Sequence, residues 1–182
     1  DTSCATSAAP AGTPKKGGGL RMGTRGGSND LIDGQHIVSK ADIARIMTGW
    51  ESLLNFDPDY KVVNTDSLAE ELETKAADNY IVRLKKDLMF ADGKPVRAED
   101  VIYSFTRMLD PESAVFGGSA LRPVLDPSGM TKVDERTIEF KLKQPFAIFN
   151  EALCGYTTCI VPEGYERFAG GGHARASGLK LE

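Results

Sequence analysis

Residues 84–111, LKKDLMFADGKPVRAEDVIYSFTRMLDP, constrain the fold more than any other stretch of the chain. Asp92-Gly93 favours a turn, and Glu99 and Asp100 after it are typical of the first turn of a helix. Apolar residues then recur at helical spacing up to Asp110-Pro111, where proline disfavours further helix. The segment therefore predicts the end of a strand, a turn and an amphipathic helix. The apolar face of that helix consists of Val101, Ile102, Phe105, Met108 and Leu109.

Two other segments alternate apolar and polar residues, which predicts half-buried strands. The first, at residues 79–87, puts Tyr80, Val82 and Leu84 on one face. The second spans residues 136–145 and is followed by a short predicted helix at 146–153. Residues 67–73 fit either a helical turn or an extended link, and residues 159–168 predict a strand end and a turn.

The N-terminal half predicts one more strand and one more helix. Residues 19–25 alternate and predict a first strand. Residues 39–42, SKAD, form a capping box that opens a helix, and Pro58 ends it. The apolar face of this helix is expected to be core: Ile43, Ile46, Met47, Trp50, Leu53 and Leu54.

Strands and helices therefore mix without a regular βαβ repeat, which predicts a mixed α/β (α+β) fold. The net charge of -4 and the isoelectric point of about 5.3 do not favour nucleic acid or an anionic membrane as a partner. No apolar run is long enough to span a bilayer. Residues 1–19 are small and polar, so we expect a flexible tether, which suits a protein held at a surface by its N-terminus.

Catalytic patterns are weak in this sequence. His36 and His173 are its two histidines, and neither lies in a nucleophile motif, so a hydrolase is disfavoured. A glycosidase needs two facing carboxylates. Because the chain has 26 acidic residues, some pair will always look suitable, so the acidic residues identify no active site. We therefore expect no catalytic residue, no metal and no cofactor, and predict that the protein is not an enzyme.

The cysteines leave two alternatives open. The chain has three, and Cys154 and Cys159 are the only close pair. They could form a local disulfide in an oxidising compartment, or remain two buried thiols.

The Gly-rich segment GTRGGSNDLIDG follows the predicted first strand, as a phosphate loop would. It lacks both GxGxxG and the ending of a P-loop. Exposed backbone N–H groups, the Ser28 hydroxyl and the Asn29 amide could instead cradle a small ligand. An ordinary strand-to-helix connection fits its composition equally well.

Residues 84–111 also resemble the signature of the family 5 extracellular solute-binding proteins, the peptide- and nickel-binding receptors of ABC importers. The family pattern is a Phe, Asp-Gly-x-Pro and Ala-Glu-Asp-Val, which here begins at Phe90, Asp92 and Ala98. The resemblance extends in order over residues 20–168. Ser52 departs from it by replacing the usual Gly, and Arg97 by occupying the usual Ser or Thr N-cap position.

The resemblance implies a type II periplasmic-binding-protein scaffold, of which this chain is an N-terminal fragment. It divides the chain into a tether at 1–19, the start of lobe one at 20–56, a subdomain at 57–168 and an irregular tail at 169–182. The loop after the first strand contributes to the cleft in the family. The resemblance therefore implies four ligand-binding residues in this loop: Gly27, Ser28, Asn29 and Asp30.

The implied function is the solute-binding component of an ABC import system, with oligopeptides as the expected solute and permease subunits as partners. Its expected place is the extracellular face of the membrane or the periplasm, with a lipid anchor at the N-terminus of the full-length precursor. A sensory or interaction module on the same scaffold is the alternative, and a secreted hydrolase ranks behind it. For this chain alone, we expect weak peptide binding or none.

Overall fold

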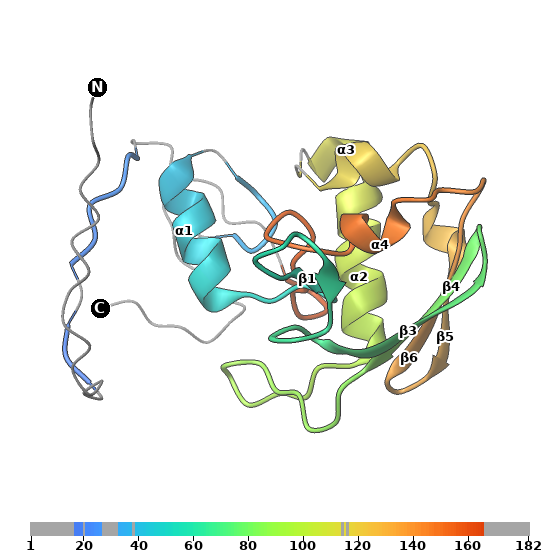
Figure 1. Cartoon of the computed structure of the whole chain (residues 1–182), viewed down its shortest axis with the longest axis horizontal. Helices are drawn as coiled ribbons and strands as arrows, with labels where there is room; N and C mark the ends of the chain where they lie inside the picture. The colour runs from blue at the N-terminus through green and yellow to red at the C-terminus, as the bar shows by residue number, and fades with distance from the viewer. Residues whose placement is uncertain are drawn as a thin grey trace.

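A four-stranded antiparallel sheet in the order β3-β4-β6-β5 is the larger of the two sheets in the described part of the chain. The computed structural model describes residues 17–19, 21–26, 33–37, 39–113, 115 and 117–165. Two hairpins build the sheet and are joined by the pairing of β4 with β6 (Figure 1). The four strands are β3 (Ala69–Ala76), β4 (Asn79–Leu84), β5 (Met130–Asp134) and β6 (Thr137–Lys141).

The alternation read from the sequence matches the two faces of this sheet. Val82 on β4 pairs with Ile138 on β6, and both side chains are fully buried, whereas Arg83 faces solvent. The strands predicted at 79–87 and 136–145 are therefore confirmed. Residues 67–73 take the extended alternative and lead into β3.

Helix α2 (Ala98–Leu109) follows the predicted turn and packs on the buried face of the sheet (Figure 1). Gly93 closes the turn with a φ of +85°, a conformation that glycine adopts without steric cost. Arg97 offers no side-chain acceptor as N-cap, but the Asp100 carboxylate accepts a hydrogen bond from the Arg97 backbone N–H at 2.8 Å. The turn at Asp92-Gly93 and the acidic start of the helix are both signals from neighbouring residues. The sequence therefore located the strand end, the turn and the helix correctly.

Aromatic side chains fill the space between α2 and the sheet. The ring of Phe140 on β6 lies 5.2 Å from that of Phe105 on α2 and 5.5 Å from that of Phe149. All three side chains are fully buried. The elements that close this core are short: η1 (Pro111–Ser113), α3 (Gly118–Leu121), η2 (Pro127–Gly129) and α4 (Phe149–Ala152). Helix α4 confirms part of the helix predicted at 146–153.

Helix α1 (Lys40–Gly49) begins at the predicted capping box but ends earlier than expected. The Ser39 hydroxyl accepts hydrogen bonds from the N–H groups of Ala41 and Asp42. The Asp42 carboxylate in turn accepts a hydrogen bond from the Ser39 backbone N–H. Trp50 is extended, with φ -135° and ψ 154°, so it ends the helix. The prediction of one helical face up to Leu54 is therefore wrong.

Leu53 and Leu54 nonetheless belong to the hydrophobic core, because the chain after Trp50 continues into the part of the molecule that contains the sheet. The Leu54 N–H donates to the carbonyl oxygen of Leu153 at 3.1 Å. A small hairpin follows, of β1 (Asn55–Phe56) and β2 (Val62–Val63). Met47, expected in the core, is 66% exposed.

The strand predicted at 19–25 does not form in the described part of this segment. Residues 21–26 are exposed and have no regular structure, and the Met22 side chain is 64% exposed. Alternation is sufficient for a strand only where a neighbour supplies hydrogen bonds. The described strands pair among themselves and none lies beside this segment.

Ser52 joins three segments of the body. Its buried hydroxyl donates to the Leu54 carbonyl at 2.7 Å and accepts from the Gly155 N–H at 3.1 Å, and its backbone carbonyl accepts from Leu68. Ser52, which replaces the usual glycine of the family pattern, thus holds these three segments together through its hydrogen bonds.

Replacing Ser52 by alanine should lower the free energy of unfolding by about 1–3 kcal/mol, because the partly buried Gly155 N–H loses its acceptor and the buried Leu54 carbonyl loses its donor. Urea unfolding followed by circular dichroism measures the change. The matched control is Ser113→Ala, since the exposed Ser113 hydroxyl also bonds a backbone carbonyl. Equal losses in the two variants would contradict a structural role for Ser52.

Candidate functional site

The four predicted ligand-binding residues lie outside the residues that the structure describes: Gly27, Ser28, Asn29 and Asp30. Arg25 and Gly26 precede them and are exposed. Asp33 to Ile37 follow them and are mostly buried. The structure therefore shows how the chain is held immediately after the predicted ligand loop.

Asp33 is held by a bidentate ion pair with Arg107 of α2. The guanidinium nitrogens lie 2.6 and 3.1 Å from the two carboxylate oxygens. The Arg107 side chain is 11% exposed and that of Asp33 only 4%. Paired charge-assisted bonds of this kind fix geometry as well as adding energy, so this contact ties residue 33 to the helix.

Gln35 completes the attachment and is fully buried. Its amide nitrogen donates to the carbonyl oxygens of Ser104 at 3.2 Å and Cys159 at 2.9 Å, while its amide oxygen accepts from Arg107 at 2.8 Å. One side chain thus joins residues 33–37 to α2 and to the C-terminal segment. Every polar atom of this side chain has a partner.

Tyr165 covers the same cluster from the C-terminal side. Its ring centroid lies 5.4 Å from the Arg107 guanidinium, a cation–π arrangement. Burial, with the nearby Asp33 charge, raises the pKa of Tyr165 to about 12. The phenol is therefore neutral at physiological pH. We call Asp33, Gln35, Arg107 and Tyr165 the Asp33–Arg107 cluster.

The segment leading to Tyr165 is also fixed on α2. The Ser104 hydroxyl donates to the carbonyl oxygen of Val161 and accepts from its N–H at 2.9 Å. The Tyr103 hydroxyl donates to the carbonyl oxygen of Tyr165 at 2.7 Å. Residues 159–162 are extended without strand pairing, and a turn follows, so the predicted turn is confirmed and the strand end is not.

The Asp33–Arg107 cluster contains no free nucleophile, since its polar groups bond one another or the backbone. Its charges are paired and its phenol is neutral. Such an arrangement positions backbone and does not perform proton transfer or covalent chemistry.

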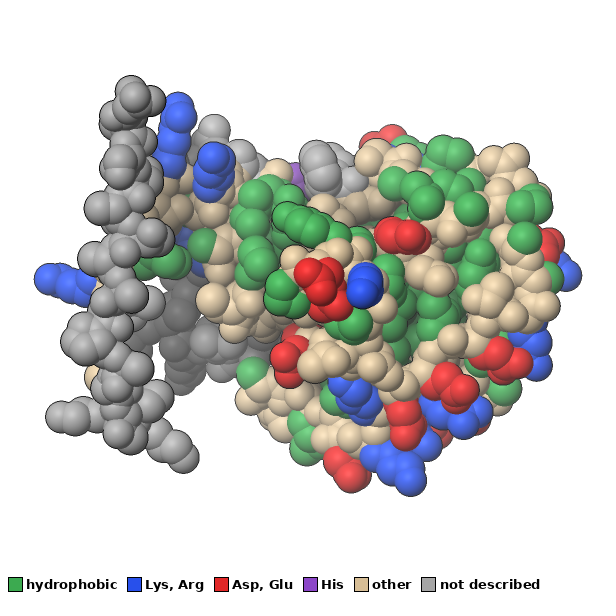
Figure 2. All heavy atoms as spheres, viewed as in Figure 1, with side chains coloured by type: hydrophobic (Ala, Val, Ile, Leu, Met, Phe, Trp, Pro, Cys, Tyr) green, Lys and Arg blue, Asp and Glu red, His purple; other side chains and the backbone are tan. Residues whose placement is uncertain are grey.

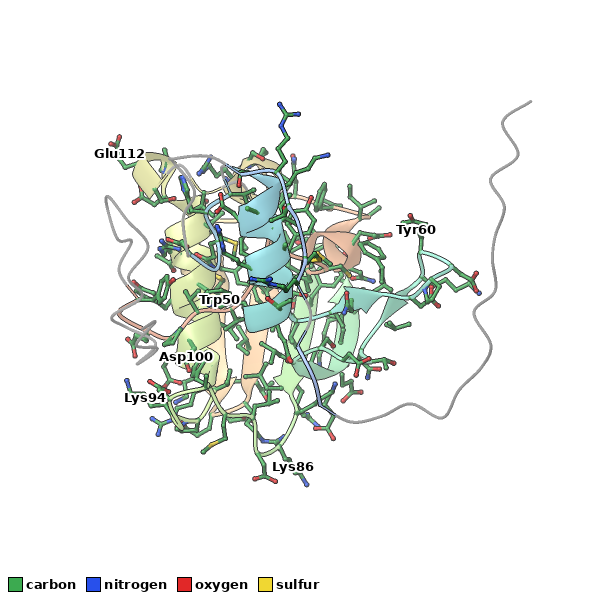
Figure 3. The ribbon with its side chains drawn as sticks, turned by 90° about the vertical axis from the view of Figure 1, so that its left-hand side faces the viewer. Trp50, Tyr60, Lys86, Lys94, Asp100 and Glu112 are labelled. Carbon is green, nitrogen blue, oxygen red and sulfur yellow. The ribbon has the colours of Figure 1, made fainter. Side chains whose placement is uncertain are left out.

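An open hollow of about 520 Å³ lies beside Trp50. An adjoining hollow of about 290 Å³ shares Met47, Trp50 and Glu51 with it. We call the two together the Trp50 cleft. Figure 3 shows Trp50 near the centre of the molecule, at the end of α1. Gly34 packs against the indole so closely that an added Cβ would lie 2.7 Å from Trp50 Cδ1.

Most residues that line the larger hollow have apolar side chains, but polar atoms supply about half of its exposed surface. The lining consists of Met47, Thr48, Gly49, Trp50, Glu51, Leu68, Asp87, Leu88, Met89, Phe90, Ala91, Val96 and Ile160. The smaller hollow adds Ser52, Asn55, Asp66, Gly155, Tyr156 and Cys159. Neither set contains Lys, Arg or His.

Cys154 and Cys159 are free, buried thiols, so the disulfide alternative is not the one that the structure contains. Their sulfurs face different carbonyl oxygens, those of Asn150 at 3.3 Å and Tyr156 at 3.6 Å. Burial, aided by a nearby glutamate in each case, raises the pKa to about 11 for Cys154 and about 12 for Cys159. Both thiols are therefore protonated and poorly nucleophilic near neutral pH.

Within the described ranges, no group of three or more His, Cys, Asp or Glu side chains could hold a metal ion. The helices seen in the same ranges are all too short or too polar to cross a bilayer. Figure 2 shows acidic and basic side chains interspersed over the part of the molecule that carries the sheet, without a large region of one sign on this face.

The sequence profile of the bacterial extracellular solute-binding proteins, family 5 middle region, matches residues 65–175 of the chain. This match covers more than half of the chain, and the chain belongs to that family.

Individual relatives agree with this assignment. The periplasmic oligopeptide-binding protein OppA of Escherichia coli is 31% identical in an alignment of 111 residues that covers 53% of this chain and 20% of OppA. The murein tripeptide binding protein MppA of Escherichia coli superposes with a TM-score of 0.65 at 23% identity, over 72% of this chain and 28% of MppA. The oligopeptide-binding protein AppA from Bacillus subtilis, solved with a nonapeptide, gives 0.64 at 25% identity, over 75% and 26%. The chain thus spans between a fifth and a third of the length of these relatives.

Sequence reasoning missed the Asp33–Arg107 cluster. Arg107 and Asp33 are 74 positions apart, so no local spacing links them.

Proposed function

We propose that this chain is part of the solute-binding component of an ABC import system and that its solute is an oligopeptide. The observation that carries the proposal is the family match over residues 65–175. OppA, named for oligopeptide binding, and AppA, solved with a nonapeptide, favour peptides among the solutes of the family. The activity is binding without chemistry.

In this proposal the predicted loop forms part of one wall of the solute cleft. Asp33 and Gln35 fix the end of the loop on α2, which limits the positions that it can take. Asp30 then meets the amino terminus of the peptide. Closure of two lobes on the solute and docking of the closed form on permease subunits would complete the transport cycle.

The division of the chain belongs to the same proposal. Residues 20–56 begin lobe one, residues 57–168 form its subdomain, and residues 1–19 tether the body. The proposed place is the outer face of the membrane or the periplasm, and a lipid anchor would hold the full-length precursor.

Peptide binding to the 182-residue chain tests the solute. We expect tri- to pentapeptides to shift backbone amide NMR signals with a Kd of about 1 mM, as is typical of a partial site. N-acetylated forms of the same peptides should bind more weakly, because Asp30 loses its cation. Maltotriose should cause no shift.

The variant Asp30→Asn should remove the preference for a free amino terminus, and the exposed Asp59→Asn should retain it as control. Because weak binding or none is expected of this chain alone, the deciding titration uses the full-length protein, and no shift with any peptide there would contradict the peptide proposal. Shifts with maltotriose alone would assign another solute class.

A further inference from the structure

The Trp50 cleft combines an apolar, aromatic lining with carboxylates. Glu51 and Asp87 line the larger hollow, and Glu51 and Asp66 line the smaller one. No Lys, Arg or His lines either hollow. Among the described residues, the charges in the lining are therefore all negative, and the Lys85 ammonium group lies next to the lining, bonded to the Ser67 carbonyl oxygen.

These carboxylates are available to a ligand. The ion pairs formed within the described part of the chain use other acids, such as Asp33, Asp42 and Glu99. Glu51 is close enough to the smaller hollow for its charge to act on the Cys159 thiol. A carboxylate beside low-dielectric walls attracts a cation more strongly than one in bulk water.

The apolar lining is of the kind that accepts an organic cation. Trp50 and Phe90 are half-buried and offer ring surface. Met47 and Met89, exposed by 66% and 61%, add polarizable and adaptable side chains at the rim. An ammonium group over an aromatic face is attracted by the ring quadrupole, most strongly at tryptophan.

We propose that the Trp50 cleft binds an organic cation, an ammonium group attached to an aromatic or aliphatic body. The apolar body would lie against Trp50, Phe90 and the methionines, and the ammonium group would lie beside Glu51. The complementary charge argues for this occupant over a neutral or anionic one. The proposal does not depend on the proposed function.

Trp50 supplies a direct readout, because it is the only tryptophan of the chain. Titration with phenethylammonium, followed by the fluorescence of Trp50, should give saturable binding. The uncharged probe 2-phenylethanol is isosteric with this cation, and 3-phenylpropionate carries a negative charge on the same phenethyl body. We expect the cation to bind about three- to tenfold more tightly than the alcohol, the effect of one partly screened carboxylate, and the anion to bind least.

Glu51→Gln and Asp87→Asn should each reduce the preference for the cation over the alcohol, and the triple variant that also carries Asp66→Asn should abolish it. Glu112→Gln is the matched control, because Glu112 is exposed and lies at the edge of the molecule, far from Trp50 (Figure 3). This control should keep the full preference.

Three outcomes would overturn the proposal. One is equal affinity for the cation and the alcohol, and another is no change of fluorescence with any probe. The third is concentration-dependent dimerisation in sedimentation that Met89→Lys abolishes, which would assign the cleft to a second copy of the chain.

Discussion

Replacing Phe140 by alanine should lower the free energy of unfolding by about 3–5 kcal/mol. Phe140 lies at the centre of the sheet, pairs with Tyr80 and Met130 on the neighbouring strands, and contacts the rings of Phe105 and Phe149. Truncation removes these contacts and leaves a cavity that α2 and the sheet cannot close. Urea unfolding followed by far-ultraviolet circular dichroism measures the loss.

Val133→Ala is the control for this prediction, since Val133 is on β5 and its side chain is 56% exposed. It should change the free energy of unfolding by less than about 0.5 kcal/mol. If Phe140→Ala does not fold, Phe140→Leu keeps most of the volume and should cost about 1.5 kcal/mol or less. A loss for Phe140→Ala as small as that of the control would contradict the core assigned here.

Arg107→Ala should cost about 3–5 kcal/mol, because it leaves the Asp33 carboxylate buried without its cation. Gln35 would lose the donor to its amide oxygen as well. The same unfolding measurement applies. Amide hydrogen exchange of residues 33–37 should also become faster, since these residues would lose their attachment to α2.

Arg83→Ala is the matched control for the ion pair. Arg83 lies 3.8 Å from Glu71, and the two side chains are 49% and 61% exposed. Solvent screens this pair, so we expect a loss below about 0.5 kcal/mol. The double variant Asp33→Ala, Arg107→Ala should cost less than the sum of the single variants. Additive losses, or equal losses for Arg107→Ala and Arg83→Ala, would show that the buried pair is not coupled.

The sequence predicted best those elements whose signals are local. The turn at Gly93, the helix after it and the alternation in β4 each depend on residues a few positions apart. The capping box at Ser39 is local in the same sense and was located to the residue. These signals also carried the resemblance to the family, which the profile match confirms.

The errors concern features that depend on distant partners. Helix α1 ends at Trp50 because the following residues bond Leu153 and the segment near Ile160. The strand predicted at 19–25 has no described neighbour. The Asp33–Arg107 cluster joins residues 74 positions apart. Whether Cys154 and Cys159 are bonded to each other depends on the direction in which each side chain points, which the sequence does not specify. The predicted ligand residues 27–30 stay a prediction.

The position of β3 at one end of the strand order has a consequence for how molecules meet in a crowded solution. A terminal strand offers unpaired N–H and C=O groups on which a foreign strand can assemble. Glu70, Glu71 and Glu73 lie along β3 and are exposed. These glutamates pair with Arg136, Arg83 and Lys75, so a foreign strand added to β3 would have to accommodate a row of charged side chains, which disfavours growth of the sheet by strand addition.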